Sequence, residues 1–140
     1  MLHLIKLSVG PKDVGQLRAV QRLRAQARPP LRHQTRSVPR RKAELLQGGS
    51  IFWVVAGFVQ VRQRLLDIIE DRWDDETACC GLVLDPELVP VEARAMKAFQ
   101  GWRYLDPKDA PADVDDGAAA QGADALPEHL KRALREARLI

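Results

Sequence analysis

The feature that most constrains the fold is a series of short apolar segments between residues 51 and 105, joined by links of only a few residues. Their alternation of apolar and polar positions, with Gly, Pro or Asp at the joints, predicts strands. The predicted strands are Ile51–Val55, Phe58–Ile69, Ala78–Leu84, Val89–Met96 and Ala98–Leu105. Because consecutive strands with short connections pair antiparallel, we expect a small, strongly curved antiparallel sheet or barrel.

The first half of the chain adds one strand and two helices to this expectation. A strand is predicted over Leu2–Val9, and a helix over Lys12–Ala27 that a pair of prolines ends. The apolar stripe of that helix is expected to comprise Leu17, Val20, Leu23 and Ala27. Residues 28–39 predict a basic loop, and Arg40–Gln47 a short helix ended by two glycines. The predicted class is therefore α+β.

The domain organisation follows from length and local composition. Residues 1–105 are expected to form a single α+β domain, since 140 residues suffice for one core. Residues 106–125 are rich in Asp, Ala, Pro and Gly and predict a flexible linker. Residues 126–140 predict a C-terminal amphipathic helix, so the expected fold has two N-terminal helices and one C-terminal helix.

Charge is distributed unevenly along the chain. Val14 to Ala43 contains no Asp or Glu but nine Arg and Lys residues. Residues 1–72 hold 14 basic and 5 acidic side chains, whereas residues 73–140 hold 8 basic and 14 acidic ones. The basic half can pair internally with the acidic half, or it can face an anionic partner such as nucleic acid.

No familiar catalytic or metal-binding pattern is present. The three histidines lie in different predicted elements and the two cysteines are adjacent, so no metal site and no cofactor are predicted. Lys42 and Glu44 could act as anchor and general base if buried together, but an exposed ion pair is the simpler interpretation of Glu44. No secretory signal is recognisable and the longest apolar run is too short to span a bilayer, which predicts a cytoplasmic protein without membrane contact.

A set of basic and aromatic residues forms the predicted nucleic-acid site. Arginines beside stacking aromatics suit single-stranded or structured RNA. The candidates are Arg32, Arg36, Arg40, Arg41, Lys42, Arg62, Arg64, Trp102, Arg103 and Tyr104. In the alternative interpretation the aromatic rings fill the core, and Arg62 and Arg64 pair with the acidic half.

Four segments carry a resemblance to a known family: KAELLQGGSIFWVV at 42–55, VQVRQRL at 59–65, LVLDPELVP at 82–90 and FQGWRYL at 99–105. They resemble domain-of-unknown-function family 1489, a group of short alphaproteobacterial proteins. The resemblance covers nearly the whole chain. It implies a bacterial cytosolic protein and implies no activity.

A second resemblance concerns the fold alone. A short helix ending in Gly, then a strand, then a long curved strand is similar to the opening of PUA-like and ASCH-type barrels, which mostly bind RNA or modified bases. Together these features predict an RNA-binding module, with DNA a less favoured partner. The alternatives are an enzyme acting on a modified nucleoside or small anionic substrate, and a homodimer in which the basic half of one chain meets the acidic half of another.

Overall fold

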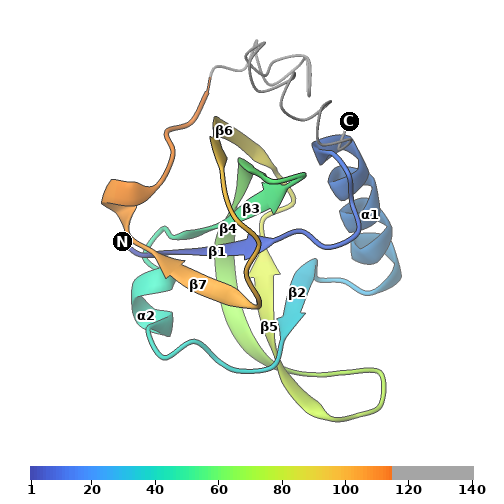
Figure 1. Ribbon diagram of the computed structural model, residues 1–140. Helices are drawn as coiled ribbons and strands as arrows, with labels where there is room; N and C mark the ends of the chain where they lie inside the picture. Colours follow the sequence, from blue (N-terminus) through green and yellow to red (C-terminus); the bar gives the residue numbers. More distant parts are fainter. Residues whose placement is uncertain (115–140) are drawn as a thin grey trace.

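The computed structural model describes residues 1–114, which form one mixed sheet of seven strands with two helices beside it (Figure 1). The strands are β1 (His3–Leu7), β2 (Arg32–Thr35), β3 (Ser50–Val55), β4 (Phe58–Arg72), β5 (Ala78–Leu84), β6 (Val89–Ala95) and β7 (Trp102–Leu105). The helices are α1 (Val14–Ala27) and α2 (Lys42–Leu45), with a 3-10 turn at Pro107–Asp109. The strand order is β2-β5-β4-β3-β1-β7, and β6 also pairs with β4.

The long strand β4 organises this sheet. One of its edges pairs with β3 over residues 58–64. Its other edge pairs first with β6, near residues 58–62, and then with β5, over residues 65–72. Between these two pairings, the backbone N–H of Asp85, which lies in the β5–β6 connection, donates to the carbonyl of Arg64 at 3.0 Å. Thus β5 and β6 follow one another along a single edge of β4, with a break between them.

Both faces of the sheet are buried around its centre. One apolar cluster lies on the side of the helices and includes Leu4, Trp53, Leu82 and Leu17 of α1. The other lies beneath β6 and the segment that follows it, and includes Phe52 and Val59. All six residues of β3 are buried as a result. A strand covered on both faces has a continuous apolar sequence, as Ile51–Val55 does.

The predicted α+β class with three helices is wrong. Within residues 1–114 the molecule is mostly sheet with two helices, and α2 is only four residues long. The sheet is also mixed and open rather than antiparallel or barrel-like, because β1 pairs with β3 in parallel. The chain crosses over through α1 and β2 between these strands, and a parallel pair requires such a crossover. The predicted helix over residues 126–140 lies outside the described residues.

The strand β2 replaces part of the predicted basic loop. It pairs antiparallel with β5, with Arg32 opposite Val83 and Thr35 opposite Cys80. Its residues are polar and half-buried, so they lack the apolar alternation that identifies a strand. Beyond β7, residues 106–114 lie along β6, where the backbone N–H of Glu92 donates to the carbonyl of Ala112 at 2.8 Å. These described residues belong to the predicted linker segment.

The buried face of α1 differs from the predicted stripe. Leu17 and Gln21 are buried, whereas Leu23 is 67% exposed. Asp13 caps the helix by accepting from the backbone N–H of Gln16 at 2.7 Å. Gln21 can lie on the core-facing side of α1 because its amide forms hydrogen bonds with a buried partner on the sheet, Gln63. The predicted stripe is therefore correct at Leu17 and Val20 but wrong at Leu23 and Ala27, which are exposed.

The hairpin between β4 and β5 allows a first prediction. Glu76 has a φ of 70°, a left-handed conformation that costs non-glycine residues roughly 1 kcal/mol or more. We expect Glu76→Gly to raise the free energy of unfolding by about 0.5–1 kcal/mol, as measured by urea denaturation. As a control, Glu70→Gly in the extended part of β4 should lower it by a similar amount. A loss of stability in Glu76→Gly would contradict the assigned turn geometry.

Candidate functional site

Two adjoining cavities lie between α1 and the start of β2. The inner cavity has a volume of about 220 Å³ and is bounded by α1, the end of β1, β2 and β3. The outer cavity has a volume of about 180 Å³ and lies between the end of α1 and β2. Both are lined by Arg24 and Arg32, so they form one continuous depression, which we call the α1–β2 groove.

The inner cavity is built on the sheet. Lys6 of β1 lies opposite Trp53 of β3 in the parallel register, so both side chains point to the helix side. The indole Nε1–H of Trp53 donates to Oε1 of Gln63 at 2.8 Å. Gln63 also exchanges two hydrogen bonds with Gln21 of α1, at 2.8 and 2.7 Å. This buried amide network fixes α1 against the sheet and holds the floor of the cavity.

His33 is the unusual group in the inner cavity. Its ring packs edge to face against Trp53, with 5.4 Å between the ring centroids. Its Nε2 is buried and has no hydrogen-bond partner among the described residues. Burial, aided by the charges of Lys6 and Arg24, lowers the pKa of His33 from 6.5 to about 4. The imidazole is therefore neutral at physiological pH, in a positive field.

The lining of the groove carries only one sign of charge. Lys6, Arg24, Arg28 and Arg32 line it, and no Asp or Glu of residues 1–114 does. Within the same residues, neither Lys6 nor Arg24 forms an ion pair. Burial lowers the pKa of Lys6, whose ammonium donates to the carbonyl of Leu7 at 3.3 Å. A concave site of this kind concentrates anions.

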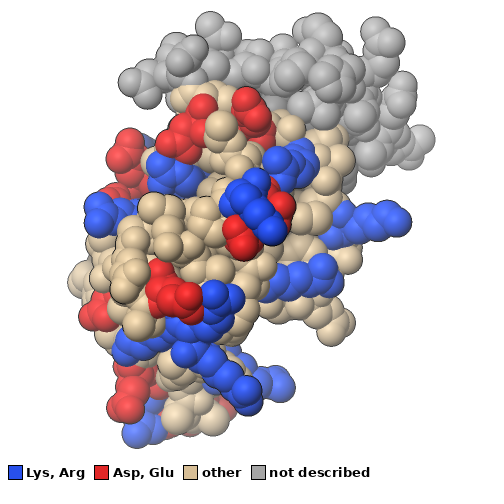
Figure 2. Space-filling view, turned by 90° about the vertical axis from the view of Figure 1, so that its left-hand side faces the viewer, with Lys and Arg blue, Asp and Glu red and all other residues tan. Residues whose placement is uncertain are grey.

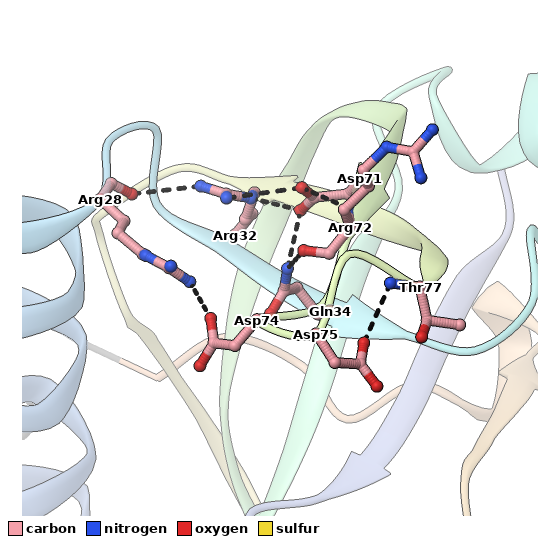
Figure 3. A network of polar contacts seen from close by, with 8 residues as sticks. All are labelled: Arg28, Arg32, Gln34, Asp71, Arg72, Asp74, Asp75 and Thr77. Carbon is pink, nitrogen blue, oxygen red and sulfur yellow. Dashed lines mark hydrogen bonds and ion pairs between the residues drawn. The ribbon is translucent and has the colours of Figure 1, made fainter.

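The hairpin after β4 fixes the other two arginines from outside the groove (Figure 3). Asp71 accepts from Arg32, in a pair whose side chains are only 17% and 13% exposed. Asp74 accepts from Arg28 at 2.5 Å on the surface. Arg32 accordingly lowers the pKa of Asp71. Gly81 leaves room for the buried pair, because a Cβ there would lie 2.9 Å from Oδ2 of Asp71. Two acidic residues near the turn between β4 and β5 thus neutralise part of the basic run.

Four of the predicted site residues lie on the loop after β2 and on α2. Arg36, Arg40, Arg41 and Lys42 are exposed. On the face that carries α2 and β7, basic and acidic side chains are interspersed (Figure 2). Arg41 pairs with Glu44 at 2.5 Å and lowers the pKa of that carboxyl. Lys42 and Glu44 are both exposed and line neither cavity, which argues against their use as anchor and base.

Arg62 and Arg64, the arginines predicted on the long strand, do not line the groove. Arg62 pairs with Asp113 at 2.7 Å and donates to the hydroxyl of Ser50 at 3.0 Å. This ion pair lowers the pKa of Asp113. Arg64, two residues further along β4, is exposed. The pairing of Arg62 with an acid of the second half matches the alternative interpretation that the basic half is satisfied internally.

The predicted aromatic residues pack against the core. Trp102 and Tyr104 are partly buried on the helix-side cluster and meet edge to face at 5.1 Å. The hydroxyl of Tyr104 accepts from the backbone N–H of Arg41 at 3.1 Å. Arg103, on the other face of β7, lies over the ring of Phe99 at 4.4 Å. The rings of Trp102 and Tyr104 therefore pack against the hydrophobic core. Of the ten predicted residues, Arg32 alone lines the groove.

Four charged or titratable groove residues were not predicted from the sequence, namely Lys6, Arg24, Arg28 and His33. The sequence pattern around Lys6 could have identified this residue, since Lys6 occupies the same face of its strand as the buried Leu2 and Leu4. A basic residue on the core-facing side of a strand indicates either the end of the strand or a functional site. For Arg24 and His33 no such local signal exists, because their proximity depends on the packing of α1 against β2.

Comparison with known proteins identifies one family. The family described as protein of unknown function (DUF1489) matches residues 4–140. No curated protein and no solved structure matches the chain. Neither helix of residues 1–114 has the length and apolar character needed to cross a membrane.

Proposed function

The chain belongs to this DUF1489 family, and we propose that it is a cytoplasmic RNA-binding protein whose binding surface is the α1–β2 groove. The observation that carries the proposal is the lining of the groove, which combines four cationic side chains with no carboxylate among residues 1–114. Nucleic-acid affinity comes chiefly from contacts between such cations and phosphates. The proposed interface, at α1 and β2, differs from the predicted one, which comprised the basic loop of residues 28–42, the Arg62/Arg64 face of β4 and the aromatic residues of β7.

The shape of the groove favours single-stranded RNA over duplex DNA. Its two cavities are small, about 220 and 180 Å³, and share Arg24 and Arg32 as lining residues. A single strand can place successive phosphates or an unstacked base into such depressions, whereas the backbone of a duplex cannot leave its helical path. Arg28 and Arg32 are held in place by Asp74 and Asp71, so the side chains at the entrance are already oriented.

The proposal is tested by reversing charge on one face of α1. We expect Arg24→Glu/Arg28→Glu to weaken binding of a fluorescently labelled single-stranded RNA by at least about tenfold in fluorescence anisotropy. Binding by the parent should weaken with salt, with a slope of log K on log salt near −2 for about three phosphate contacts.

Arg18→Glu/Arg22→Glu is the matched control, because these arginines are exposed on the same helix and line neither cavity. It carries the same change in net charge and should lose much less affinity. Equal losses in both variants would show that binding is non-specific to the basic half of the chain. A parent protein that binds no RNA at low salt would overturn the proposal.

A further inference from the structure

The inner cavity holds a cluster of three nitrogen-bearing side chains that the fold leaves without anionic partners. Lys6 enters from β1, Arg24 from α1 and His33 from β2. Within residues 1–114, neither Lys6 nor Arg24 forms an ion pair. His33 lines the same cavity, and its buried Nε2 has no hydrogen-bond partner among these residues, whereas buried polar groups in proteins are nearly always paired.

The size of the cavity limits what this ligand can be. About 220 Å³ is less than the roughly 300 Å³ at which sites for whole drug-sized molecules begin. Trp53, which lines the cavity, is only 4% exposed and therefore offers little ring surface for a base to stack on. A compact polar anion fits this space better than an aromatic ring does.

We propose that the inner cavity is a subsite for a phosphate monoester, held by Lys6, Arg24 and the imidazole of His33. Two cations and a further hydrogen-bonding group match a dianionic monoester better than the single charge of an internal phosphodiester. The shared chemistry fits two sources, the 5′-terminal phosphate of an RNA and a free mononucleotide. As an RNA-end subsite, the inference rests on the function proposed above.

Ligand binding should change the protonation of His33. In the free protein the charged groups facing the ring are Lys6 from β1 and Arg24 from α1, both positive, while β3 and β5 contribute only Trp53 and Leu84. Burial, together with these two charges, lowers the pKa of His33 to about 4. A bound dianion adds the opposite charge, so the pKa of His33 should rise, by about one unit for each tenfold difference in affinity between the two protonation states.

The experiment uses inorganic phosphate and two short RNAs of one sequence, carrying either a 5′-phosphate or a 5′-hydroxyl. We expect phosphate to shift the imidazole NMR signals of His33 and raise its titration midpoint. His3 serves as an internal reference, because its Nδ1 accepts from the backbone N–H of Ser50 at 3.0 Å away from the cavity. The 5′-phosphorylated RNA should bind at least about tenfold more tightly than its 5′-hydroxyl counterpart, a difference of about 1.4 kcal/mol.

Lys6→Met should remove the preference for the 5′-phosphate, whereas the control Lys12→Met, on an exposed residue outside both cavities, should keep it. Equal binding of the two RNAs overturns the RNA-end subsite and leaves the RNA-binding proposal intact. If phosphate shifts His33 but neither RNA binds, the subsite serves a free mononucleotide and the RNA-binding proposal fails. If phosphate does not shift the His33 signals and neither RNA binds, both the subsite and the RNA-binding proposal fail.

Discussion

Replacing Gln63 with leucine is expected to lower the free energy of unfolding by about 3–5 kcal/mol. Gln63 is fully buried and takes part in four hydrogen bonds. Its amide joins Trp53 of β3, Gln21 of α1 and the carbonyl of Asp85. Leucine would leave all three groups without this partner, two of them buried and the Asp85 carbonyl half-buried, and each unsatisfied buried group costs about 1–3 kcal/mol. This loss is a large part of the roughly 5–15 kcal/mol typical of a domain.

Urea denaturation of two variants and their combination would measure this effect. Gln47→Leu is the matched control, because Gln47 is exposed and should change stability by less than about 0.5 kcal/mol. In a double-mutant cycle, Gln21→Leu should cost less in the Gln63→Leu background than in the parent, since its partner is already gone. Strict additivity, or a loss below about 1 kcal/mol for Gln63→Leu, would show that the network does not fasten α1 to the sheet.

Gly49→Ala is the second substitution with a large expected effect. A Cβ at this position would lie 2.2 Å from the carbonyl oxygen of Leu2 and 2.4 Å from that of Leu45. Both atoms belong to the backbone, one at the start of β1 and one in α2, so neither can move aside as a side chain could. The carbonyl of Gly49 also accepts from the backbone N–H of Leu65 at 2.9 Å. We expect a loss of about 4 kcal/mol or more in the free energy of unfolding.

Gly10→Ala separates this steric effect from the general cost of replacing glycine. Gly10 has a φ of 105°, but a methyl group added there would have no neighbouring atom within 4 Å, so the substitution should cost only about 1–2 kcal/mol. Thermal and urea denaturation would compare the two variants. If Gly49→Ala is no less stable than Gly10→Ala, the close approach of β1, α2 and β4 at Gly49 is absent in solution.

The strands of the second half were predictable because their signals are local. Ala78–Leu84 is a strand over the predicted residues, and Phe58 begins the long strand as expected. Each is bounded by turn residues and follows the period of two. The parallel pairing of β1 with β3 was not predictable in this way, because it joins segments separated by α1 and β2. Partners that are distant in sequence leave no local pattern.

The candidate site shows the same division. The acid-free run contains Arg24, Arg28 and Arg32 of the groove, but only Arg32 was among the predicted site residues. Asp71 and Asp74, which hold two of these arginines, become their neighbours only when β5 pairs with both β2 and β4. Charge counts along the chain therefore did not predict which of the arginines line one groove.

The position of β1 between β3 and β7 has a consequence for synthesis in the cell. The first strand to leave the ribosome, His3–Leu7, receives its second neighbour only when Trp102–Leu105 has been made. At about 5–20 residues per second, translation delays that pairing by roughly 5–20 s. During this interval one edge of β1 is an open template for other chains. The sheet can therefore be completed only after Trp102–Leu105 has been made, and chaperones that shield nascent strands have several seconds in which to act.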